Sequence, residues 1–96
     1  MTTGGDAPGM NAAIRSVVRY GVYNKLEVLG VLRGWWGLIN EELNPFDHRS
    51  VSGIINLGGT ILKTARCPEF QTEQGQERAF NTKKKNAIDG IVVIGG

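Results

Sequence analysis

The segment Thr2 to Asn11, TTGGDAPGMN, holds the residues whose types and spacing best suit ligand chemistry. Gly4 and Gly5 lack a Cβ, so their backbone N–H groups can approach a ligand closely. The residues from Met10 onward are predicted to form a helix. A helix that follows a glycine-rich turn presents free N–H groups and the positive end of its dipole to anions. The segment therefore predicts an anion site, with phosphate as the first candidate ligand.

Two alternatives stay open for this segment. A glycine-rich turn between a strand and a helix also occurs for close packing alone. Asp6 could cap the helix, the commoner role for Asp before a helix, or hold a water or a metal ion beside a bound phosphate.

Composition limits the classes of protein to which the chain can belong. Its 96 residues are enough for one small domain, and 41% apolar and 21% charged residues are typical of a soluble globular protein. It has no apolar run of membrane-spanning length and no secretion signal, so we expect a cytoplasmic protein that does not contact a membrane. A net charge of +2 does not favour a nucleic-acid partner.

Metal-ligating residues are scarce. Cys67 is the single cysteine and His48 the single histidine, so the sequence contains no cluster with the spacing of a structural zinc site. The basic run Lys83 to Lys85 closes a predicted helix, where cations offset the negative end of the dipole. We interpret this run as a solvated face.

Apolar spacing predicts the elements that position the glycine turn. A helix begins at Met10, and residues on its predicted apolar stripe recur at helical spacing: Ile14, Val17, Val18, Gly21 and Val22. Residues 27–32 are predicted as a strand, and residues 34–40 as a turn leading to a short helical or irregular segment. Trp35 either packs or lines a pocket.

The middle of the chain is predicted from its breakers and caps. Pro45 is expected to break regular structure, and Asp47 to cap a helix whose stripe is Val51, Ile54 and Ile55 and whose end is Gly58 and Gly59. Residues 60–62 are expected to be extended. Residues 65–70 are expected to form a loop because Pro68 forbids regular structure, and Thr72 to cap a helix that runs to about Lys85.

The last residues, Ile88 to Gly96, have the sequence IDGIVVIGG, an apolar and β-branched run typical of a central strand in a parallel sheet. Strands that alternate with helices predict a doubly wound α/β sheet, in which ligands bind beyond the carboxyl ends of the strands. Gly95 and Gly96 would lie on that edge together with Gly4 and Gly5. This coincidence favours the glycine turn as a ligand site.

Both ends of the chain favour a fragment of a larger enzyme. Residues 1–3 span at most about 10 Å, too short for a strand that crosses a sheet. No helix follows residues 88–96 to cover the last strand. We therefore expect residues 1–96 to be part of an N-terminal α/β domain from which most of the first strand and the C-terminal remainder are missing.

Four motifs support a family assignment: TTGGDAPGMNAAIRSVVR, RSVSGIINLGGTIL, TARCPEF and IDGIVVIGG. In this order and at this spacing they resemble the bacterial ATP-dependent 6-phosphofructokinase family over essentially the whole chain. The resemblance implies roughly the first third of such an enzyme and a Rossmann-like, doubly wound parallel sheet.

The resemblance also implies a reaction. The family transfers the γ-phosphoryl group of ATP to the 1-hydroxyl of fructose 6-phosphate, with Mg²⁺, in a cytoplasmic homotetramer. By position, Gly5 matches a backbone contact to the ATP phosphates, Arg66 and Cys67 match an ATP-binding pair, and Phe70 matches a position near adenine. Gln71 departs from the family, which usually has a basic residue there.

An effector site is implied as well. Arg15 and Arg19 lie one helical turn apart, where like charges repel slightly, and from the residues alone they suggest a solvated face. The resemblance instead matches them to an allosteric site for a nucleoside diphosphate or phosphoenolpyruvate at a subunit interface. His48 and Arg49 match the other side of that site. We assign His48 mainly a capping or surface role and leave open which of the two reaches an effector.

Catalysis needs residues that this chain does not include. In the family, an Asp that holds Mg²⁺ follows the position of Gly96, and the base and the sugar site come later. We therefore assign no catalytic or metal-ligating residue here and expect no turnover from these residues alone. Two alternatives are a pyrophosphate-dependent phosphofructokinase and a non-catalytic module that binds a nucleotide or effector.

Overall fold

The computed structural model describes residues 1–5 and 7–95, except for the side chain of Ile55. The predictions for Asp6, for Gly96 and for the Ile55 side chain lie outside the described residues. The elements in chain order are β1 (Thr2–Thr3), α1 (Met10–Tyr23), β2 (Val28–Val31), α2 (Gly34–Ile39), β3 (Leu43–Phe46), the 3-10 helices η1 (Ile54–Asn56) and η2 (Pro68–Gln71), α3 (Glu73–Lys85) and β4 (Ile94–Gly95).

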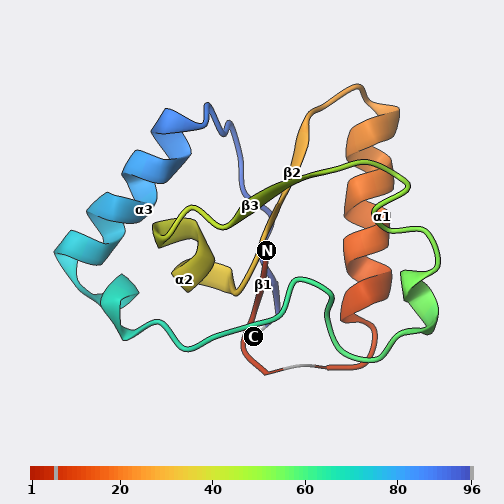
Figure 1. The fold of residues 1–96 in the computed structure, drawn as a ribbon, viewed down its shortest axis with the longest axis horizontal. Coiled ribbons are helices and arrows are strands. Elements are labelled where there is room, and N and C mark those ends of the chain that lie inside the picture. The colour runs from red at the N-terminus through yellow and green to blue at the C-terminus, as the bar shows by residue number, and fades with distance from the viewer. Residues whose placement is uncertain (6, 96) are drawn as a thin grey trace.

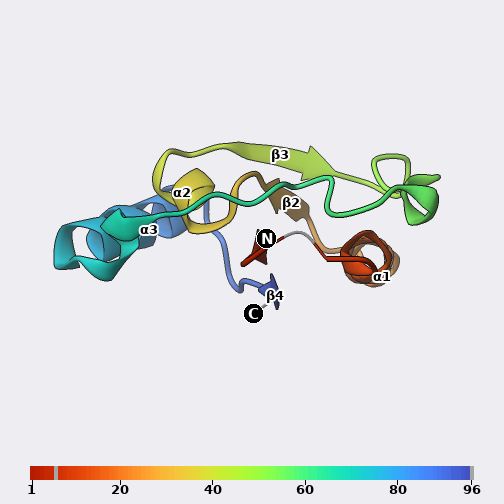
Figure 2. The same ribbon diagram turned by 90° about the horizontal axis from the view of Figure 1, so that it is seen from below.

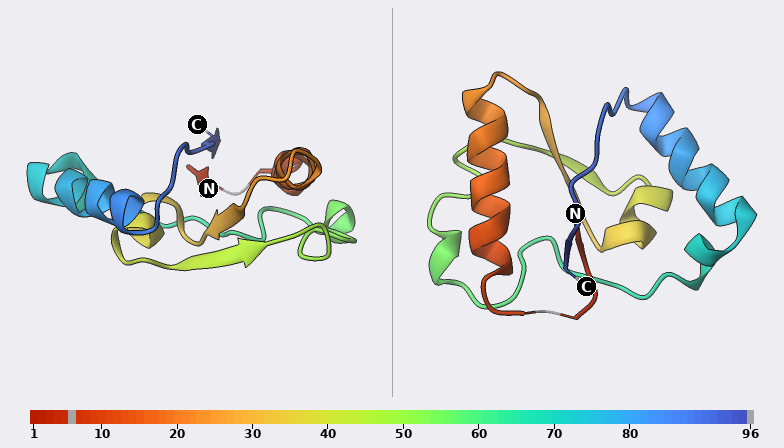
Figure 3. Two further views of the ribbon diagram at one scale, coloured as in Figure 1. Left: turned by 90° about the horizontal axis from the view of Figure 1, so that it is seen from above. Right: turned by 180° about the vertical axis from the view of Figure 1, so that it is seen from behind.

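The strands lie between two groups of helices (Figure 1). Figure 2 shows them in the order β3, β2, β1 and β4, with α1 on one side and α2 and α3 on the other. β1 pairs with β4 in parallel, Thr2 opposite Ile94 and Thr3 opposite Gly95, and both strands are seen from two further sides in Figure 3. The predicted α/β fold, with helices on both sides of the strands, is confirmed.

Two apolar clusters form the core, one on each side of the strands. The cluster that includes α1 contains Ile14, Val18, Val51, Ile54 and Leu62. The cluster that includes α2 and α3 contains Met1, Val31, Leu38, Ile39 and Ala79. Each helix face is therefore buried against the strands, as a two-sided α/β arrangement requires.

Helix α1 is confirmed where the apolar spacing predicted it. Ile14 and Val18 are buried, and Gly21 lies so close to β2 that a Cβ there would be 2.6 Å from Val28 Cγ2. The residue before the helix, Gly9, has φ 90° and no side chain to cap the first turn. Glycine at this position lets the chain turn sharply into the helix.

Helix α3 is also confirmed, together with its cap. The Thr72 hydroxyl accepts a hydrogen bond from the Gly75 N–H at 3.0 Å, which satisfies one of the free donors of the first turn. At the other end, Lys84 and Lys85 are exposed, and the Lys85 ammonium pairs with Glu41 at 3.3 Å.

The prediction that Pro45 breaks regular structure is wrong. Pro45 lies within β3, opposite Leu29 in an antiparallel pairing with β2. Among the described strands β3 pairs only with β2, and an edge strand tolerates a residue that lacks an N–H donor. The Phe46 ring covers Gly30, where a Cβ would lie 2.6 Å from Cζ, and this packing fixes the register.

The helix predicted after Asp47 is wrong, because residues 47–53 form turns and only η1 is helical. Gly53 has φ 80°, which interrupts a right-handed helix. Asp47 does cap this turn, since its carboxylate accepts from the N–H groups of Arg49 at 2.9 Å and Ser50 at 3.1 Å. These hydrogen bonds, led by that from Ser50, hold the pKa of Asp47 below its ordinary value.

Three further differences concern loops and the last strand. Residues 60–62 form a turn rather than an extended piece, and Pro68 begins the helix η2 instead of forbidding one, because its fixed φ suits a first helical position. The last strand is limited to Ile94–Gly95, and Val92 and Val93 are about half exposed rather than buried in a central strand. Among the described strands β4 pairs only with β1, so one strand edge and one face stay open.

A groove of about 600 Å³ marks this open face. It lies between α1, β2 and residues 86–94, and apolar residues on it are strongly exposed: Tyr20 at 71%, Leu26 at 60% and Val92 at 53%. No helix in residues 1–5 and 7–95 is long and apolar enough to cross a bilayer.

The 96-residue chain by itself is expected to bind the dye ANS or to self-associate, because an apolar groove and an open strand edge are exposed. Leu26→Lys, which places a charge in the groove, should reduce ANS fluorescence. Leu57→Lys is the matched control, since Leu57 is 56% exposed and outside the groove lining. A monomer that unfolds cooperatively and does not bind ANS would contradict this prediction.

Candidate functional site

A pocket of about 520 Å³ lies where two distant segments of the chain meet. One segment is the turn that leaves β1, with Gly4 and Gly5. The other is the loop before η2, with Thr64, Ala65 and Arg66. The predicted glycine turn therefore lines a pocket, whereas the first turn of α1 is not among the lining residues.

The two glycines of the turn have different backbone roles. Gly4 has φ 76°, a conformation that favours glycine. Gly5 has no such φ, and a Cβ built on it would meet no atom of the described chain within 4 Å. Neither strain nor packing in the described residues requires glycine at position 5. Open space above a bare backbone is instead what a closely bound ligand needs.

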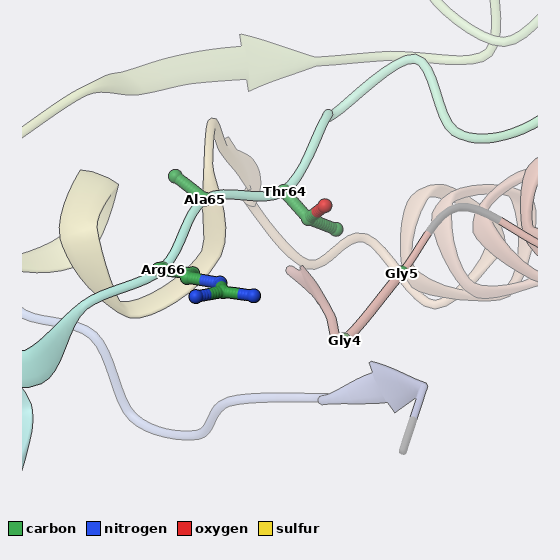
Figure 4. Close-up of a pocket in the computed structure, with 5 residues that line it drawn as sticks. All are labelled: Gly4, Gly5, Thr64, Ala65 and Arg66. Atoms are coloured by element: carbon green, nitrogen blue, oxygen red, sulfur yellow. The ribbon is translucent and has the colours of Figure 1, made fainter.

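The opposite rim presents a positive charge and a hydroxyl. Figure 4 shows the side chains of Thr64 and Arg66 directed toward the side on which Gly4 lies, and Ala65 directed away. Arg66 is exposed, and none of the three ion pairs within the described residues involves it. Its guanidinium is thus available to an anion bound against the glycine turn.

Cys67 and Phe70 are not among the residues that line this pocket. Cys67 is a half-buried free thiol that packs against the core cluster of α2 and α3. The Phe70 ring stacks on Trp35, with ring centroids 4.0 Å apart and planes inclined by 10°. This contact shows that Trp35 packs, which was one of its two predicted roles.

Contacts to α3 fix η2, the helix that follows Arg66. Arg78 pairs with Glu69. Gly75 of α3 comes so close that a Cβ there would lie 1.8 Å from the Glu69 carbonyl oxygen. The loop with Arg66 therefore leads into a segment that contacts α3 closely.

Comparison with known proteins extends these observations to the whole chain. The family model described as Phosphofructokinase matches residues 1–96. The chain belongs to the phosphofructokinase family. Its similarity covers all 96 residues of the chain and 30% of each curated relative: 62% identity to an ATP-dependent 6-phosphofructokinase of Clostridium botulinum and 57% to one of Thermotoga neapolitana.

Solved structures agree with the family assignment. The chain matches the Pichia pastoris phosphofructokinase in the T-state with a TM-score of 0.96 and 42% identity, over 100% of this chain and 10% of that one. It matches the Saccharomyces cerevisiae phosphofructokinase with a TM-score of 0.96 and 41% identity, over 100% of this chain and 13% of that one. The predicted family and its α/β fold are therefore confirmed.

The four positions matched to an effector site lie near one core cluster of this phosphofructokinase-family chain. Arg15 is half-buried and Arg19 exposed on α1, while His48 and Arg49 are exposed in the turn before η1. The cluster that contains Ile14 and Val18 of α1 also contains Val51 and Ile54, so α1 and this turn pack on shared core residues.

Two pocket residues, Thr64 and Ala65, are absent from the sequence-based site, although they lie within the quoted motif TARCPEF. Their position directly before Arg66 was the signal that could have identified them. Gly4 was recognised as part of the turn but not assigned as a ligand contact.

The described residues of the pocket do not fit a resident Mg²⁺ ion. This hard cation prefers several oxygen ligands, and among the lining side chains only Thr64 supplies one. Residues 1–5 and 7–95 contain no group of three His, Cys, Asp or Glu side chains that could hold a metal. We therefore assign Mg²⁺ no ligand in this part of the chain.

Proposed function

We propose that this chain is part of an ATP-dependent 6-phosphofructokinase, which transfers the γ-phosphoryl group of ATP to the 1-hydroxyl of fructose 6-phosphate. The products are fructose 1,6-bisphosphate and ADP. The observation that carries the proposal is one pocket, in a phosphofructokinase-family chain, that combines the bare backbone of Gly5 with the guanidinium of Arg66. The ATP-dependent relatives support ATP as the phosphoryl donor.

The roles follow from the charge of the reaction. Phosphoryl transfer passes through a loose transition state with negative charge spread over the phosphoryl oxygens. Arg66 would offset that charge, and a backbone N–H at Gly5 would donate to a phosphate oxygen of ATP. Thr64 adds a hydroxyl beside them. No carboxylate or imidazole lines the described pocket, so we assign these residues to binding and electrostatic stabilisation and assign no catalytic base.

Cys67 and Phe70 do not line the described pocket, and we assign them to the proposed ATP site because their positions match the family. We assign Cys67 a contribution of shape or backbone contact, because it is half-buried against the core. Phe70 would border the adenine with the part of its ring that Trp35 leaves uncovered.

The proposal extends to regulation and assembly. Arg15, Arg19, His48 and Arg49 would contribute to an effector site for a nucleoside diphosphate or phosphoenolpyruvate, in a cytoplasmic homotetramer. Their support is the match of positions to the family and the shared packing of α1 with the turn before η1. The chain spans 30% of the length of the curated relatives, so we propose that it forms part of their N-terminal ATP-binding domain.

A coupled assay of the full-length protein that contains this chain tests the proposed function. With fructose 6-phosphate present, ATP should support turnover and pyrophosphate should not. Turnover with pyrophosphate alone would assign the chain to a pyrophosphate-dependent enzyme. Nucleotide binding without turnover from either donor would indicate a non-catalytic module.

Gly5→Ala in the full-length protein should raise the KM for ATP about tenfold, because the added methyl group occupies the space of the bound phosphate and so weakens its hydrogen bond from the backbone N–H of residue 5. The free energy of unfolding should change little, because the added methyl group meets no atom within 4 Å. Gly58→Ala is the matched control: it also meets nothing within 4 Å and lies outside the pocket lining. An unchanged KM for ATP in Gly5→Ala would exclude Gly5 from the ATP site.

Arg66→Ala should weaken the use of ATP by about tenfold or more, since one charge-assisted hydrogen bond is lost. Arg66→Lys should recover part of the loss, because it keeps the charge but not the planar fork of donors. Lys84→Ala, which removes an exposed cation outside the pocket, serves as the control. Wild-type kinetics for Arg66→Ala would remove Arg66 from the site.

A further inference from the structure

The two rims of the pocket are joined by a buried chain of hydroxyl groups. Thr2, two residues before Gly4, is 0% exposed. Its Oγ1 lies 3.0 Å from Oγ1 of Thr60 and donates to the carbonyl oxygen of Lys63 at 3.0 Å. Lys63 directly precedes Thr64, the first residue of the opposite rim. Thr2 therefore connects the strand that leads to the glycine turn with the loop that leads to Arg66.

The single hydrogen atom on each threonine hydroxyl sets the direction of the hydrogen bonds between these hydroxyl groups. A threonine hydroxyl has one hydrogen to donate, and that of Thr2 is donated to Lys63. Thr60 must then donate to Thr2, and the Thr60 oxygen in turn accepts from the N–H of Leu62 at 3.1 Å. Each hydroxyl thus donates once and accepts once, and no buried side-chain polar atom in the described residues lacks a partner.

The Lys63 backbone explains why this connection matters for the pocket. Lys63 has φ 60°, a left-handed conformation that is uncommon for a residue with a side chain. Such a conformation persists only where surrounding contacts hold it. The hydrogen bond from Thr2 holds the Lys63 carbonyl at the point where the chain turns into residues 64–66.

We propose that Thr2 is a positioning residue, which holds the Arg66 rim in register with the Gly4–Gly5 rim through its hydrogen bonds to Thr60 and Lys63. This inference rests on the proposed function, because register matters when both rims must contact the same polyphosphate. A displacement of about 1 Å in such a site can reduce rates by one or two orders of magnitude. Thr2 itself touches no proposed ligand.

Kinetics of the full-length protein test the inference. Thr2→Val, which removes the hydroxyl and preserves the shape, should raise the KM for ATP about tenfold. The KM for fructose 6-phosphate should change by less than about twofold, since a displaced Arg66 rim weakens the contacts to ATP and not those to the sugar. Thr2→Ser, which keeps the hydroxyl, should restore the wild-type KM for ATP.

Thr82→Val is the matched control for loss of a buried hydroxyl. Thr82 is 2% exposed and donates to the Arg78 carbonyl oxygen within α3, outside the pocket lining. It should lower the Tm and leave the KM for ATP unchanged. If Thr82→Val raises the KM as much as Thr2→Val does, or if Thr2→Val lowers only the Tm, the inference is overturned.

A double-mutant cycle with Arg66 gives a second readout. In the Thr2→Val background, Arg66→Ala should weaken ATP use by only about twofold, because a displaced guanidinium contributes little. Full additivity of the two substitutions would contradict the inference.

Two further outcomes are possible: the Thr2→Val variant does not fold, or the unsubstituted protein is inactive. If Thr2→Val does not fold, Thr60→Val decides, since it removes the donor to Thr2 and the acceptor of the Leu62 N–H while Thr2 itself is kept. A raised KM for ATP supports the inference, and an unchanged one overturns it. Inactivity of the unsubstituted protein contradicts the proposed function. An active protein whose Thr2 variants behave like the wild type contradicts only the role of Thr2.

Discussion

Close backbone packing around β1 is the constraint on which the rest of the structure depends. A Cβ at Gly34, where α2 begins, would lie 2.9 Å from the Thr2 carbonyl oxygen, and one at Gly95 in β4 would lie 2.2 Å from that of Thr3. Only glycine allows backbones to approach so closely. Because the Thr2 side chain is also fully buried, β1 is enclosed by its neighbours. The glycine turn that follows it therefore starts from a fixed place.

Two physical groups of glycine are represented by Gly34 and Gly95 on one hand and by Gly5 on the other. Those at positions 34 and 95 are needed because another part of the chain occupies the space of a side chain. Gly5 is different, since the space above it contains no atom of the described chain within 4 Å. Sequence alone cannot separate the groups, because the difference lies in what surrounds each residue. This is why the sequence leaves the packing alternative for the turn open.

Local signals predicted the parts of the fold that are determined locally. Helix α1 follows from its apolar spacing, and α3 follows from the Thr72 cap, which needs only residues three positions apart. The structures at Pro45 and at residues 60–62 were predicted incorrectly because they depend on distant partners. β3 forms against β2 with Phe46 over Gly30, and the turn at Leu62 is held where its carbonyl oxygen accepts from the Arg33 N–H at 2.8 Å. No short stretch of sequence contains that information.

The candidate site also has parts that local sequence predicts and parts that depend on distant contacts. Gly5 and Arg66 were assigned from motifs, whereas the place where their segments meet depends on contacts that no motif records. The left-handed Lys63 and its hydrogen bond from Thr2 are such contacts. A lysine carries no local preference for that conformation, so its φ could be learned only from the folded chain.

Helix α2 shows how few residues are needed to couple the two rims. Its first residue, Gly34, packs against β1, from which the glycine turn leaves, and the next, Trp35, stacks on Phe70 of η2, the helix that follows Arg66. One short helix therefore touches the supports of both rims, on the side of the strands away from α1. If Thr2 positions the two rims as proposed, these contacts of α2 would act with it to set the distance between Gly5 and Arg66. A pocket built from two loops can be rigid for this reason.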